Sequence, residues 1–476
     1  MVEQSTALIL LLILCFAVVT ISTIGTVNAE STIFVRVDGS VDGTEKIQRF
    51  GDIYMFTGNI EGSIIVENDN IVIDGSDYAL QGLGTGRGIE ILDRQNVTIR
   101  NIKITNFEIG VYIYDYSEPR NNTIHQNIIT YTTYGLYIEH AHNNTILDNT
   151  ITNNEYGIYL LESRFNVFKN NSLSNNHYNL EIHNTNFAND VDASNFVNGK
   201  PMIYWVNQQD RTVPYEAGYV ALIECENITV QNLKLTNNGQ SILLSSTKNT
   251  TIIRNIVKDN EVGIFVEDST NITICENIIA NNGVGIRIVG KFRAYSQNNR
   301  ICENNITNNN IGIHIWESSN NTLFRNHLAD NNYGIRINRL GGVAENNIIY
   351  NNNFINSTVA VPGYWHMVVF QEVWVPPQEN VWNYKNEGNY WSDYTAKYPN
   401  ATEIDDSGIW NISYVISENN QDNYALTNPL AIPEFSDEDE PTTPYEEFVP
   451  TTLLVASIVV AVISLGLVVY FKKRKH

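Results

Sequence analysis

The sequence predicts an all-β protein that folds as a right-handed parallel β-helix with coils of about 22 residues. A phrase of two asparagines, a short variable step, a glycine and alternating aliphatic residues recurs along the chain, for example over residues 153–160 and 331–337. The glycines of this phrase lie 22 residues apart at Gly135/Gly157, Gly263/Gly285 and Gly312/Gly334. The repeats are also poor in good helix formers, and a fixed period of this length is typical of a solenoid.

Each repeat contains two predicted strands. The first follows the glycine, as in residues 136–138 and 313–315, where apolar residues alternate with variable ones. The second follows an Asn-Thr step, as in residues 144–146 and 321–323. About 22 residues cannot enclose a core alone, but stacked coils can, because each strand then pairs in parallel with the next coil at about 4.8 Å.

Pairs of asparagines at a five-residue offset mark the turns of the coils. In a stack, an asparagine amide can donate to a carbonyl of the neighbouring coil and satisfy turn backbone that the strands do not reach. Asparagine also tolerates the left-handed backbone of tight corners, so we interpret these residues as structural. The pairs are Asn96/Asn101, Asn122/Asn127, Asn144/Asn149, Asn166/Asn171, Asn299/Asn304 and Asn321/Asn326.

Composition and the two chain ends indicate an exported, membrane-anchored protein. The net charge of −23 argues against nucleic acid as a partner, because phosphates need a basic surface. Residues 1–29 read as a secretory signal peptide, and 451–471 as a transmembrane helix followed by a basic tail, 472–476, on the cytoplasmic side. An acidic stalk rich in Pro and Thr, 433–450, precedes the helix. We therefore expect a single-pass protein of the cell membrane with its ectodomain outside.

The ectodomain divides into four segments. Coils are predicted over residues 30–185 and 227–360, and the repeat lapses between them over 186–226, which we interpret as an insertion. Residues 361–432 hold five tryptophans and are expected to cap the last coil, whose open edge would otherwise promote aggregation. Cys275 and Cys302 occupy equivalent places in consecutive coils, within Cα range of a disulfide, and stacked free thiols are the alternative.

Several motifs resemble the NosD-type right-handed β-helix family, in the form found on archaeal cell surfaces. They lie at residues 54–64, 70–75 and 198–201, and the most specific are Gly-Asn-Tyr-Trp-Ser-Asp-Tyr at 388–394 and Asn-Gln-Asp-Asn-Tyr at 420–424. The resemblance implies a β-helix of the carbohydrate-binding and sugar-hydrolase type. For NosD itself it implies a periplasmic role in copper-site maturation. Copper and calcium are the cofactors that this resemblance raises, the latter at Asp405 and Asp406.

A candidate carbohydrate-binding surface lies on the strands that follow the glycines. The middle residue of each strand points outward, and this column reads Tyr112, Tyr137 and Tyr159, and later Phe265, Arg287, His314 and Arg336. The tyrosines can stack on sugar rings, and charged neighbours can bond hydroxyl groups. These neighbours are Asp115, Glu139, Glu162 and Arg164. Aromatic columns also stabilise β-helices by themselves, so a purely structural role is the alternative.

A candidate metal site is His140-x-His142, beside Glu139. Alternate residues of a strand share a face, so both imidazoles could bind one ion. Solvent-exposed turn histidines without a ligand are the alternative. In sum, the sequence predicts an extracellular β-helix that binds glycans or acts as a surface adhesion or structural module. A polysaccharide-active lyase or hydrolase and a NosD-like periplasmic copper-binding protein are the alternatives.

Overall fold

The computed structural model describes residues 31–115, 120–183, 187–290, 296–339, 343–362, 364–368, 371–375, 377 and 379–432. The expected signal peptide, stalk, transmembrane helix and basic tail lie outside these described residues. No helix within the described ranges is long and apolar enough to cross a membrane.

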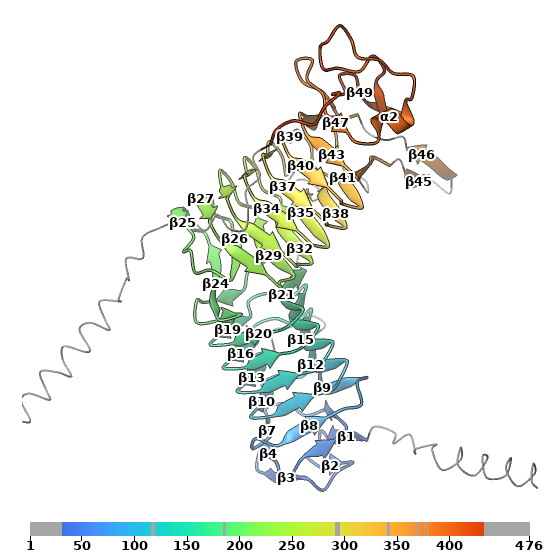
Figure 1. Cartoon of the computed structure of the whole chain (residues 1–476). Helices are drawn as coiled ribbons and strands as arrows, with labels where there is room; N and C mark the ends of the chain where they lie inside the picture. Colours follow the sequence, from blue (N-terminus) through green and yellow to red (C-terminus); the bar gives the residue numbers. More distant parts are fainter. Residues whose placement is uncertain are drawn as a thin grey trace, which may run out of the picture. The chain divides into compact units, whose positions relative to one another are not determined.

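The described residues form a right-handed parallel β-helix, as the repeat predicted (Figure 1). A typical coil supplies three strands, each to a different sheet, and each pairs in parallel with the equivalent strand of the next coil. The sequence indicated only two strands per coil. The third, such as β14 (Ile128–Thr130), is three residues long and has one fully buried side chain, too short for a clear alternation.

Five sheets result, and their strands are as follows in spatial order. The tyrosine sheet contains β2 (Val41–Asp42), β1 (Thr32–Val35), β6 (Ser63–Val66), β9 (Arg87–Leu92), β12 (Ile109–Tyr114), β15 (Tyr134–Glu139), β18 (Tyr156–Leu161) and β21 (Tyr178–His183). The second sheet contains β22 (Asp190–Val191), β19 (Val167–Lys169), β16 (Thr145–Leu147), β13 (Thr123–His125), β10 (Thr98–Arg100), β7 (Val72–Asp74), β4 (Ile53–Phe56) and β3 (Ile47–Phe50).

The spanning sheet has 15 strands and runs through both halves of the stack. Its strands are β44 (Thr358–Ala360), β41 (Tyr333–Asn338), β38 (Ile311–Trp316), β35 (Val284–Val289), β32 (Val262–Glu267), β29 (Gln240–Ser245), β26 (Tyr219–Ile223), β24 (Lys200–Val206), β23 (Phe196–Val197), β20 (Ser172–Ser174), β17 (Thr150–Thr152), β14, β11 (Lys103–Thr105), β8 (Ala79–Gln81) and β5 (Ile60–Glu61).

Two seven-stranded sheets complete the second half. One contains β25 (Gln209–Thr212), β27 (Glu226–Gln231), β30 (Thr251–Ile253), β33 (Thr273–Cys275), β36 (Arg300–Cys302), β39 (Thr322–Phe324) and β42 (Ile348–Tyr350). The other contains β28 (Lys234–Thr236), β31 (Ile256–Lys258), β34 (Ile278–Ala280), β37 (Asn305–Thr307), β40 (His327–Ala329), β43 (Asn353–Ile355) and β47 (Tyr390–Trp391).

The Trp-rich segment packs on the end of the second core. It contains the hairpins β45 (Tyr364–Val368)–β46 (Gln371–Val375) and β48 (Tyr414–Ser417)–β49 (Asn420–Asp422), and the short helix α2 (Tyr394–Lys397). Trp382 and Trp391 are 1 % and 3 % exposed, and the Trp391 ring stacks on Phe354 of the last coils at 4.4 Å between centroids. These rings exclude water from the apolar residues of the last coils.

The recurrent glycine is needed because adjacent coils approach closely. In β15, Leu136 and Ile138 are fully buried, and Gly135 lies directly before them. A Cβ atom at Gly135 would lie 2.5 Å from the carbonyl oxygen of Gly157 in the next coil. A larger residue at Gly135 would therefore force these two coils apart.

In the segment that we interpreted as an insertion, 186–226, the described residues 187–226 contain strands of the stack. They supply β22 to β26, and β23 turns back into β24 as an antiparallel pair within the spanning sheet. Beyond this turn the core lies on the other face of the sheet. In β26, Tyr219 and Ala221 pack in the first core, whereas Val220 and Leu222 pack in the second.

The sequence conceals this crossing for a physical reason. A strand with one buried face alternates apolar and polar residues, but a strand buried on both faces is a continuous apolar run. All five residues of β26 are buried, as are all six of β29. The alternation of the repeat is therefore not visible in the sequence where the sheet passes between two cores.

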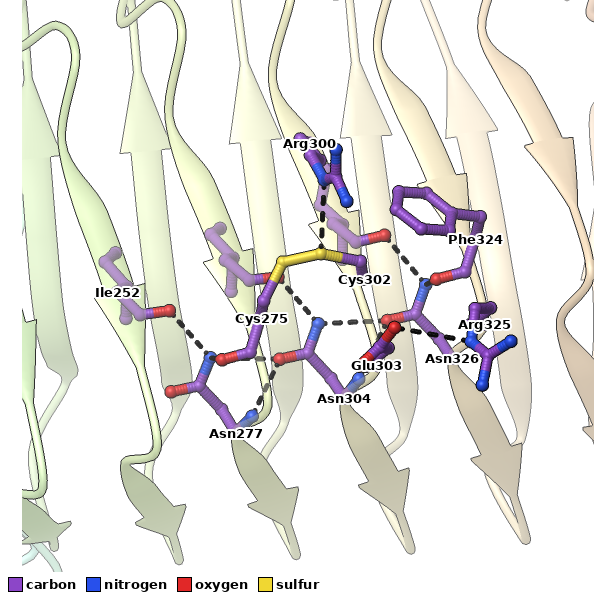
Figure 2. Close-up of a disulfide and its surroundings, with 12 residues drawn as sticks. Ile252, Cys275, Asn277, Arg300, Cys302, Glu303, Asn304, Phe324, Arg325 and Asn326 are labelled. Carbon is purple, nitrogen blue, oxygen red and sulfur yellow. Dashed lines mark hydrogen bonds and ion pairs between the residues drawn. A yellow bond between two sulfur atoms is a disulfide. The ribbon is translucent and has the colours of Figure 1, made fainter. Parts of the chain in front are cut away.

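One disulfide joins neighbouring coils (Figure 2). It connects Cys275 in β33 with Cys302 in β36, whose Cα atoms lie 4.6 Å apart. These residues are direct register partners, and the structure contains the predicted disulfide rather than two stacked free thiols. It reinforces the outer surface of one sheet, where Phe324 packs beside it.

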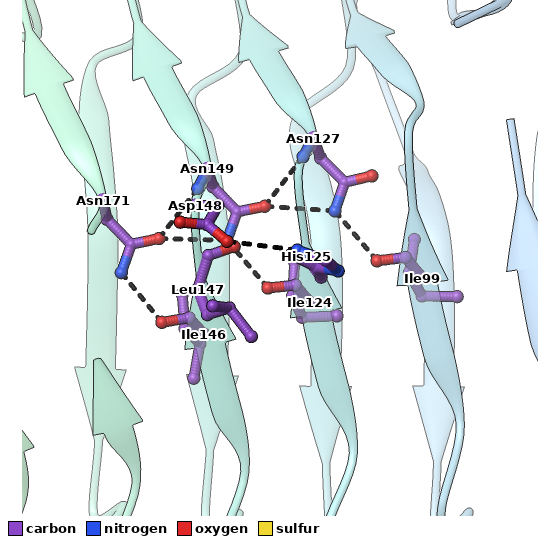
Figure 3. A network of polar contacts seen from close by, with 9 residues as sticks. All are labelled: Ile99, Ile124, His125, Asn127, Ile146, Leu147, Asp148, Asn149 and Asn171. Atoms are coloured by element: carbon purple, nitrogen blue, oxygen red, sulfur yellow. Dashed lines mark hydrogen bonds and ion pairs between the residues drawn. The ribbon is translucent and has the colours of Figure 1, made fainter. Parts of the chain in front are cut away.

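Buried asparagines hydrogen-bond from coil to coil along the turns, as predicted (Figure 3). The Asn149 side-chain amide donates to the carbonyl oxygen of Ile124 at 2.8 Å and to Oδ1 of Asn171 at 3.0 Å. Its own Oδ1 accepts the backbone N–H of Asn127 at 3.0 Å. Asn149 thus satisfies two backbone groups of the preceding coil and also bonds to the asparagine of the next coil, and these bonds are costly to lose in a buried turn.

Asparagine ladders occur in both halves of the stack, and two ladders of the second half end in the cap, at Asp422 and Asn420. The longest runs from Asn255 through Asn277, Asn304, Asn326, Asn352 and Asn389 to Asp422. Asp422 Oδ2 accepts the backbone N–H of Asn389 at 2.7 Å and the indole N–H of Trp391 at 3.0 Å. The two most specific motifs of the sequence, at 388–394 and 420–424, therefore meet as the last rung of a ladder.

Neighbouring asparagines allow a matched test of the ladders. Asn331 is 2 % exposed, and its side-chain amide donates to the carbonyl oxygens of Ile306 and Ala329. Replacing it with alanine leaves buried carbonyls unpaired. We expect Asn331→Ala to lower the free energy of unfolding by about 1–3 kcal/mol, measured by urea denaturation.

The control is the next residue, Asn332. Its side chain is exposed and donates only to Oδ1 of Asn310, which is also exposed. Asn332→Ala should change the unfolding free energy by no more than about 0.5 kcal/mol. Equal effects of the two substitutions would contradict the ladder's role.

The disulfide makes a separate prediction. It closes a loop with a sequence separation of 27 residues, which stabilises the fold by about 3–4 kcal/mol in the chain-entropy model. We expect a reducing agent to lower the denaturation midpoint of the wild type and to leave that of the Cys275→Ser/Cys302→Ser variant unchanged. A wild type insensitive to reductant would show that the bond does not stabilise the stack.

Candidate functional site

Six tyrosines form two adjacent columns on the outer face of the tyrosine sheet. Strand register aligns Tyr112, Tyr137 and Tyr159 in one column, and Tyr134, Tyr156 and Tyr178 in the other. We call this set the tyrosine face. The structure thus brings together the three predicted tyrosines and adds three more. Each added tyrosine directly precedes the glycine position of its coil. This recurrence is visible in the sequence, but our sequence analysis did not include it.

The rings of this face contact one another in regular order. Tyr134 and Tyr156 stack with 4.9 Å between centroids, and Tyr137 and Tyr159 meet edge to face at 5.0 Å. Tyr156 and Tyr178 continue the second column at 5.3 Å. The rings hold one another in place, so a bound molecule would meet a preformed aromatic surface.

Tyr112 differs from the other five. It is only 6 % exposed, and the guanidinium of Arg87 lies 3.9 Å from its ring centroid. Its hydroxyl donates to Glu139 Oε2 at 2.6 Å. Because Arg87 already covers the ring face of Tyr112, Tyr112 anchors the end of the column. Tyr137 and Tyr159 remain as the half-buried rings of the predicted site.

Burial keeps the tyrosine hydroxyls protonated. It raises the pKa of Tyr156 to about 12, with nearby Glu181 as the next cause, and it raises the pKa of Tyr159 further still for the same two reasons. Both hydroxyls are therefore hydrogen-bond donors at any physiological pH.

The predicted charged neighbours do not act as one group. Asp115 is fully buried and lies inside rather than on the face, with Nε of Arg120 3.8 Å from its Oδ1. Glu139 accepts the Tyr112 hydroxyl, as described above. Glu162 is exposed and pairs with His140 at 3.2 Å, and Arg164 lies over the ring of Phe165.

The His140-x-His142 pair does not have the geometry that the sequence suggested. Strand β15 ends at Glu139, and His140 has a φ of 51°, so the two histidines do not alternate along a strand. Nδ1 of His142 accepts the backbone N–H of Arg164 at 3.2 Å. Burial, together with the charge of Arg164, lowers the pKa of His142 and keeps the ring neutral.

The column of outward residues belongs to two sheets, not to one as we predicted. Tyr112, Tyr137 and Tyr159 are followed in register by Glu181 on β21, the last strand of the tyrosine sheet. Phe265 and Arg287 lie on the spanning sheet, in register with Leu243, which is buried in the first core. The two columns approach each other only where the core crosses the spanning sheet.

A groove of about 300 Å³ lies at this crossing, and we call it the junction groove. It is bordered by the ends of β18 and β21 on one side and by β29, β32 and β35 on the other. Its charged lining residues are Glu162, Glu181, Glu261, Glu267, His183 and Arg287.

Glu181 is the most constrained of these groups. Its side chain is 5 % exposed, its Oε1 contacts Nε2 of His183, and its buried Oε2 has no hydrogen-bond partner among the described residues. A Cβ at Gly239 would lie 2.6 Å from the Cα of Glu181, so only glycine permits this approach of β21 to β29. One signal of it is visible in the sequence, because Glu181 follows Tyr112, Tyr137 and Tyr159 at the equivalent position of the next coil.

Arg287 lies across the same groove. Its Nε is buried and also lacks a hydrogen-bond partner among the described residues. Burial lowers the pKa of Arg287, and the charges of Glu267 and Glu261 oppose that shift. Two residues that line the groove therefore each have a buried polar atom with unused hydrogen-bonding capacity, an acceptor in Glu181 and a donor in Arg287.

No group of three or more His, Cys, Asp or Glu side chains that could hold a metal ion occurs within the described ranges. Cys275 and Cys302 are joined in the disulfide, and Cys225 is buried. Within the described residues, neither the predicted pair His140 and His142 nor Asp405 and Asp406 belongs to such a group.

A family model described as "Periplasmic copper-binding protein (NosD)" matches residues 21–207 and 209–396. The two matched segments meet at the turn between β24 and β25, directly after the chain crosses to the second core. No curated protein sequence matches the chain.

Several solved structures are similar at low identity. The A-module of mannuronan C-5 epimerase AlgE6 from Azotobacter vinelandii has 18 % identity and a TM-score of 0.31, covering 65 % of this chain and 89 % of that one. The catalytic domain of a GH87 α-1,3-glucanase has 13 % identity and a TM-score of 0.30, covering 71 % and 63 %. An alginate lyase from Paenibacillus sp. str. FPU-7 has 12 % identity and a TM-score of 0.24, covering 61 % and 87 %. We draw no conclusion about this chain from these similarities.

Asp115 gives a pH-dependent prediction. Burial raises its pKa to about 7, with Arg120 opposing, against about 4 in an unfolded chain. The protonated Asp115 side chain therefore contributes to the stability of the folded state. This contribution is fully present below about pH 4 and is lost as the pH rises through about 7. Relative to Asp115→Asn, the wild type should lose up to about 1.4 kcal/mol of unfolding free energy per pH unit across that window. Urea denaturation at pH 4.5 and 8 measures this, and a constant difference would contradict it.

Proposed function

The chain belongs to the NosD family, and we propose that it binds carbohydrate chains along the tyrosine face and in the junction groove. The observation that carries the proposal is the pair of tyrosine columns, whose half-buried rings lie on successive coils of one sheet and lead to Glu181. We further propose that the protein does this at the cell surface, held by the predicted membrane helix, 451–471.

The spacing of the coils suits a chain of sugar rings. Strands of successive coils lie about 4.8 Å apart, close to the distance between neighbouring ring centroids on the tyrosine face. An aromatic ring offers an apolar face to the C–H bonds of a sugar while its hydroxyl remains available for hydrogen bonding. A saccharide lying across the coils would contact several rings without rearrangement of the protein.

The junction groove supplies the polar part of such a site. A sugar hydroxyl can donate to Oε2 of Glu181 and accept from Nε of Arg287, and both atoms are otherwise unpaired among the described residues. Buried groups with unused hydrogen bonds discriminate strongly, because a ligand that leaves them unpaired binds poorly. Aromatic rings and paired polar groups together are the combination that carbohydrate recognition needs.

Copper binding, which the family's description names, is not part of our proposal. The histidines of the predicted pair point to other partners, Glu162 for His140 and the Arg164 backbone for His142. We assign no step to copper in this chain. Cleavage of the bound saccharide would be detected separately, by assaying the oligosaccharides after incubation with the protein for new reducing or unsaturated ends.

Substitution of the half-buried rings tests the proposal. Tyr137→Ala and Tyr159→Ala each remove one stacking surface, and we expect each to weaken oligosaccharide binding about tenfold, corresponding to about 1.4 kcal/mol. Isothermal titration against an oligosaccharide panel measures the effect, and thermal melting checks that the variants fold.

The control is Tyr131→Ala. Tyr131 is 67 % exposed and lies outside the tyrosine face, in the turn before β15. The Tyr131→Ala variant should bind the same oligosaccharides with the affinity of the wild type. Unchanged binding in the Tyr137 and Tyr159 variants, or an equal loss in the Tyr131 variant, would refute the site.

A further inference from the structure

The junction groove is rich in negative charge. Four carboxylates line it, those of Glu162, Glu181, Glu261 and Glu267, against one guanidinium, Arg287, and one imidazole, His183. We propose that the saccharide bound here carries a positive charge, as an amino sugar with a free ammonium group, and that Glu181 binds that group. This inference rests on the proposed carbohydrate binding and adds to it the chemical class of the sugar.

Glu181 is built to accept such a group. Its side chain is 95 % removed from solvent, and its Oε2 is buried without a partner among the described residues. A buried carboxylate without a full set of donors is costly to maintain, and an ammonium group supplies both charge and donors. Its position is fixed by the close contact of β21 with Gly239 and by the hydrogen bond from the Ile182 backbone N–H to Gln240 Oε1 at 3.0 Å.

The adjacent aromatic rings favour the same charge. The faces of aromatic rings carry negative electrostatic potential and attract cations. Arg87 over Tyr112 is an example within this face. Glu181 adds to the negative potential, because its charge contributes to raising the pKa values of Tyr134, Tyr156 and Tyr159. The path from the tyrosine face into the groove is therefore attractive to an ammonium group throughout.

An acidic sugar fits the groove poorly. Its carboxylate would lie among four others, and the single guanidinium already interacts with Glu267 and Glu261. Arg287 is better suited to donate its free Nε–H to a hydroxyl or ring oxygen of the same sugar. A neutral sugar can satisfy both buried groups, but only with neutral donors, which form weaker hydrogen bonds to a carboxylate than an ammonium group does.

Three tetrasaccharides of different charge test the inference on the full chain. They are the tetramers of glucosamine, of N-acetylglucosamine and of galacturonate, titrated at pH 6 and low ionic strength. We expect the glucosamine tetramer to bind at least about tenfold more tightly than the N-acetylglucosamine tetramer, and the galacturonate tetramer to bind most weakly. The preference should diminish as salt is added, because screening weakens the attraction.

Glu181→Gln removes the charge while keeping the shape of the side chain. It should reduce the preference for the glucosamine tetramer to less than about threefold, with the affinity for the N-acetylglucosamine tetramer changed by no more than about twofold. Glu216→Gln is the matched control, because Glu216 is exposed and does not line the groove. It removes the same unit of net charge and should leave the preference intact.

The outcomes separate the two proposals. If none of the tetramers binds, carbohydrate binding at this site is wrong, and the inference fails with it. If the N-acetylglucosamine or galacturonate tetramer binds as tightly as the glucosamine tetramer, only the inference fails. The wild-type affinities decide this even if Glu181→Gln does not fold. A folded Glu181→Gln variant that keeps the full preference for the glucosamine tetramer would show that Glu181 does not bind the ammonium group.

Discussion

The buried asparagine amide is the interaction on which the remainder of the structure depends. Strand hydrogen bonds stack the flat parts of the coils, but they leave the backbone of the turns without partners inside a dry interior. Residues such as Asn149 and Asn277 fill this gap, because each side chain accepts a backbone N–H of the preceding coil and donates to a backbone carbonyl of that coil. Without them, each coil would bury unpaired carbonyl and N–H groups at every corner, and the surface columns would lose their register.

Much of the fold can be predicted from the sequence, because the same pattern of residues recurs in successive coils. The spacing of Gly135 and Gly157 gives the coil length, and the asparagine pairs give the turns. The positions that the sequence did not reveal are those where local pattern and burial disagree. Strand β26 is apolar throughout because it separates two cores, and Asp115 is buried although an acid at the end of a strand is usually solvated.

The candidate site was predictable only in part for the same reason. Tyr137 and Tyr159 follow from the repeat, so their shared face could be derived from register alone. Glu181 and Arg287 come together only because β23 turns back into β24 and the chain continues on the other side of the spanning sheet. The groove is thus lined by residues about a hundred positions apart in the sequence, on either side of the segment where the repeat is not visible. The functional feature thus arises where the regular structure is interrupted.

Amide hydrogen exchange at the turns tests the ladder account most directly. The backbone N–H groups of Asn127 and Asn149 lie outside the strands, yet they donate to Oδ1 of Asn149 and Asn171 at 3.0 Å and 3.1 Å. If the ladders hold the coils together, these amides exchange as slowly as that of Ile146 within β16. Exchange at the rate of exposed turn amides, with Ile146 still protected, would contradict the account.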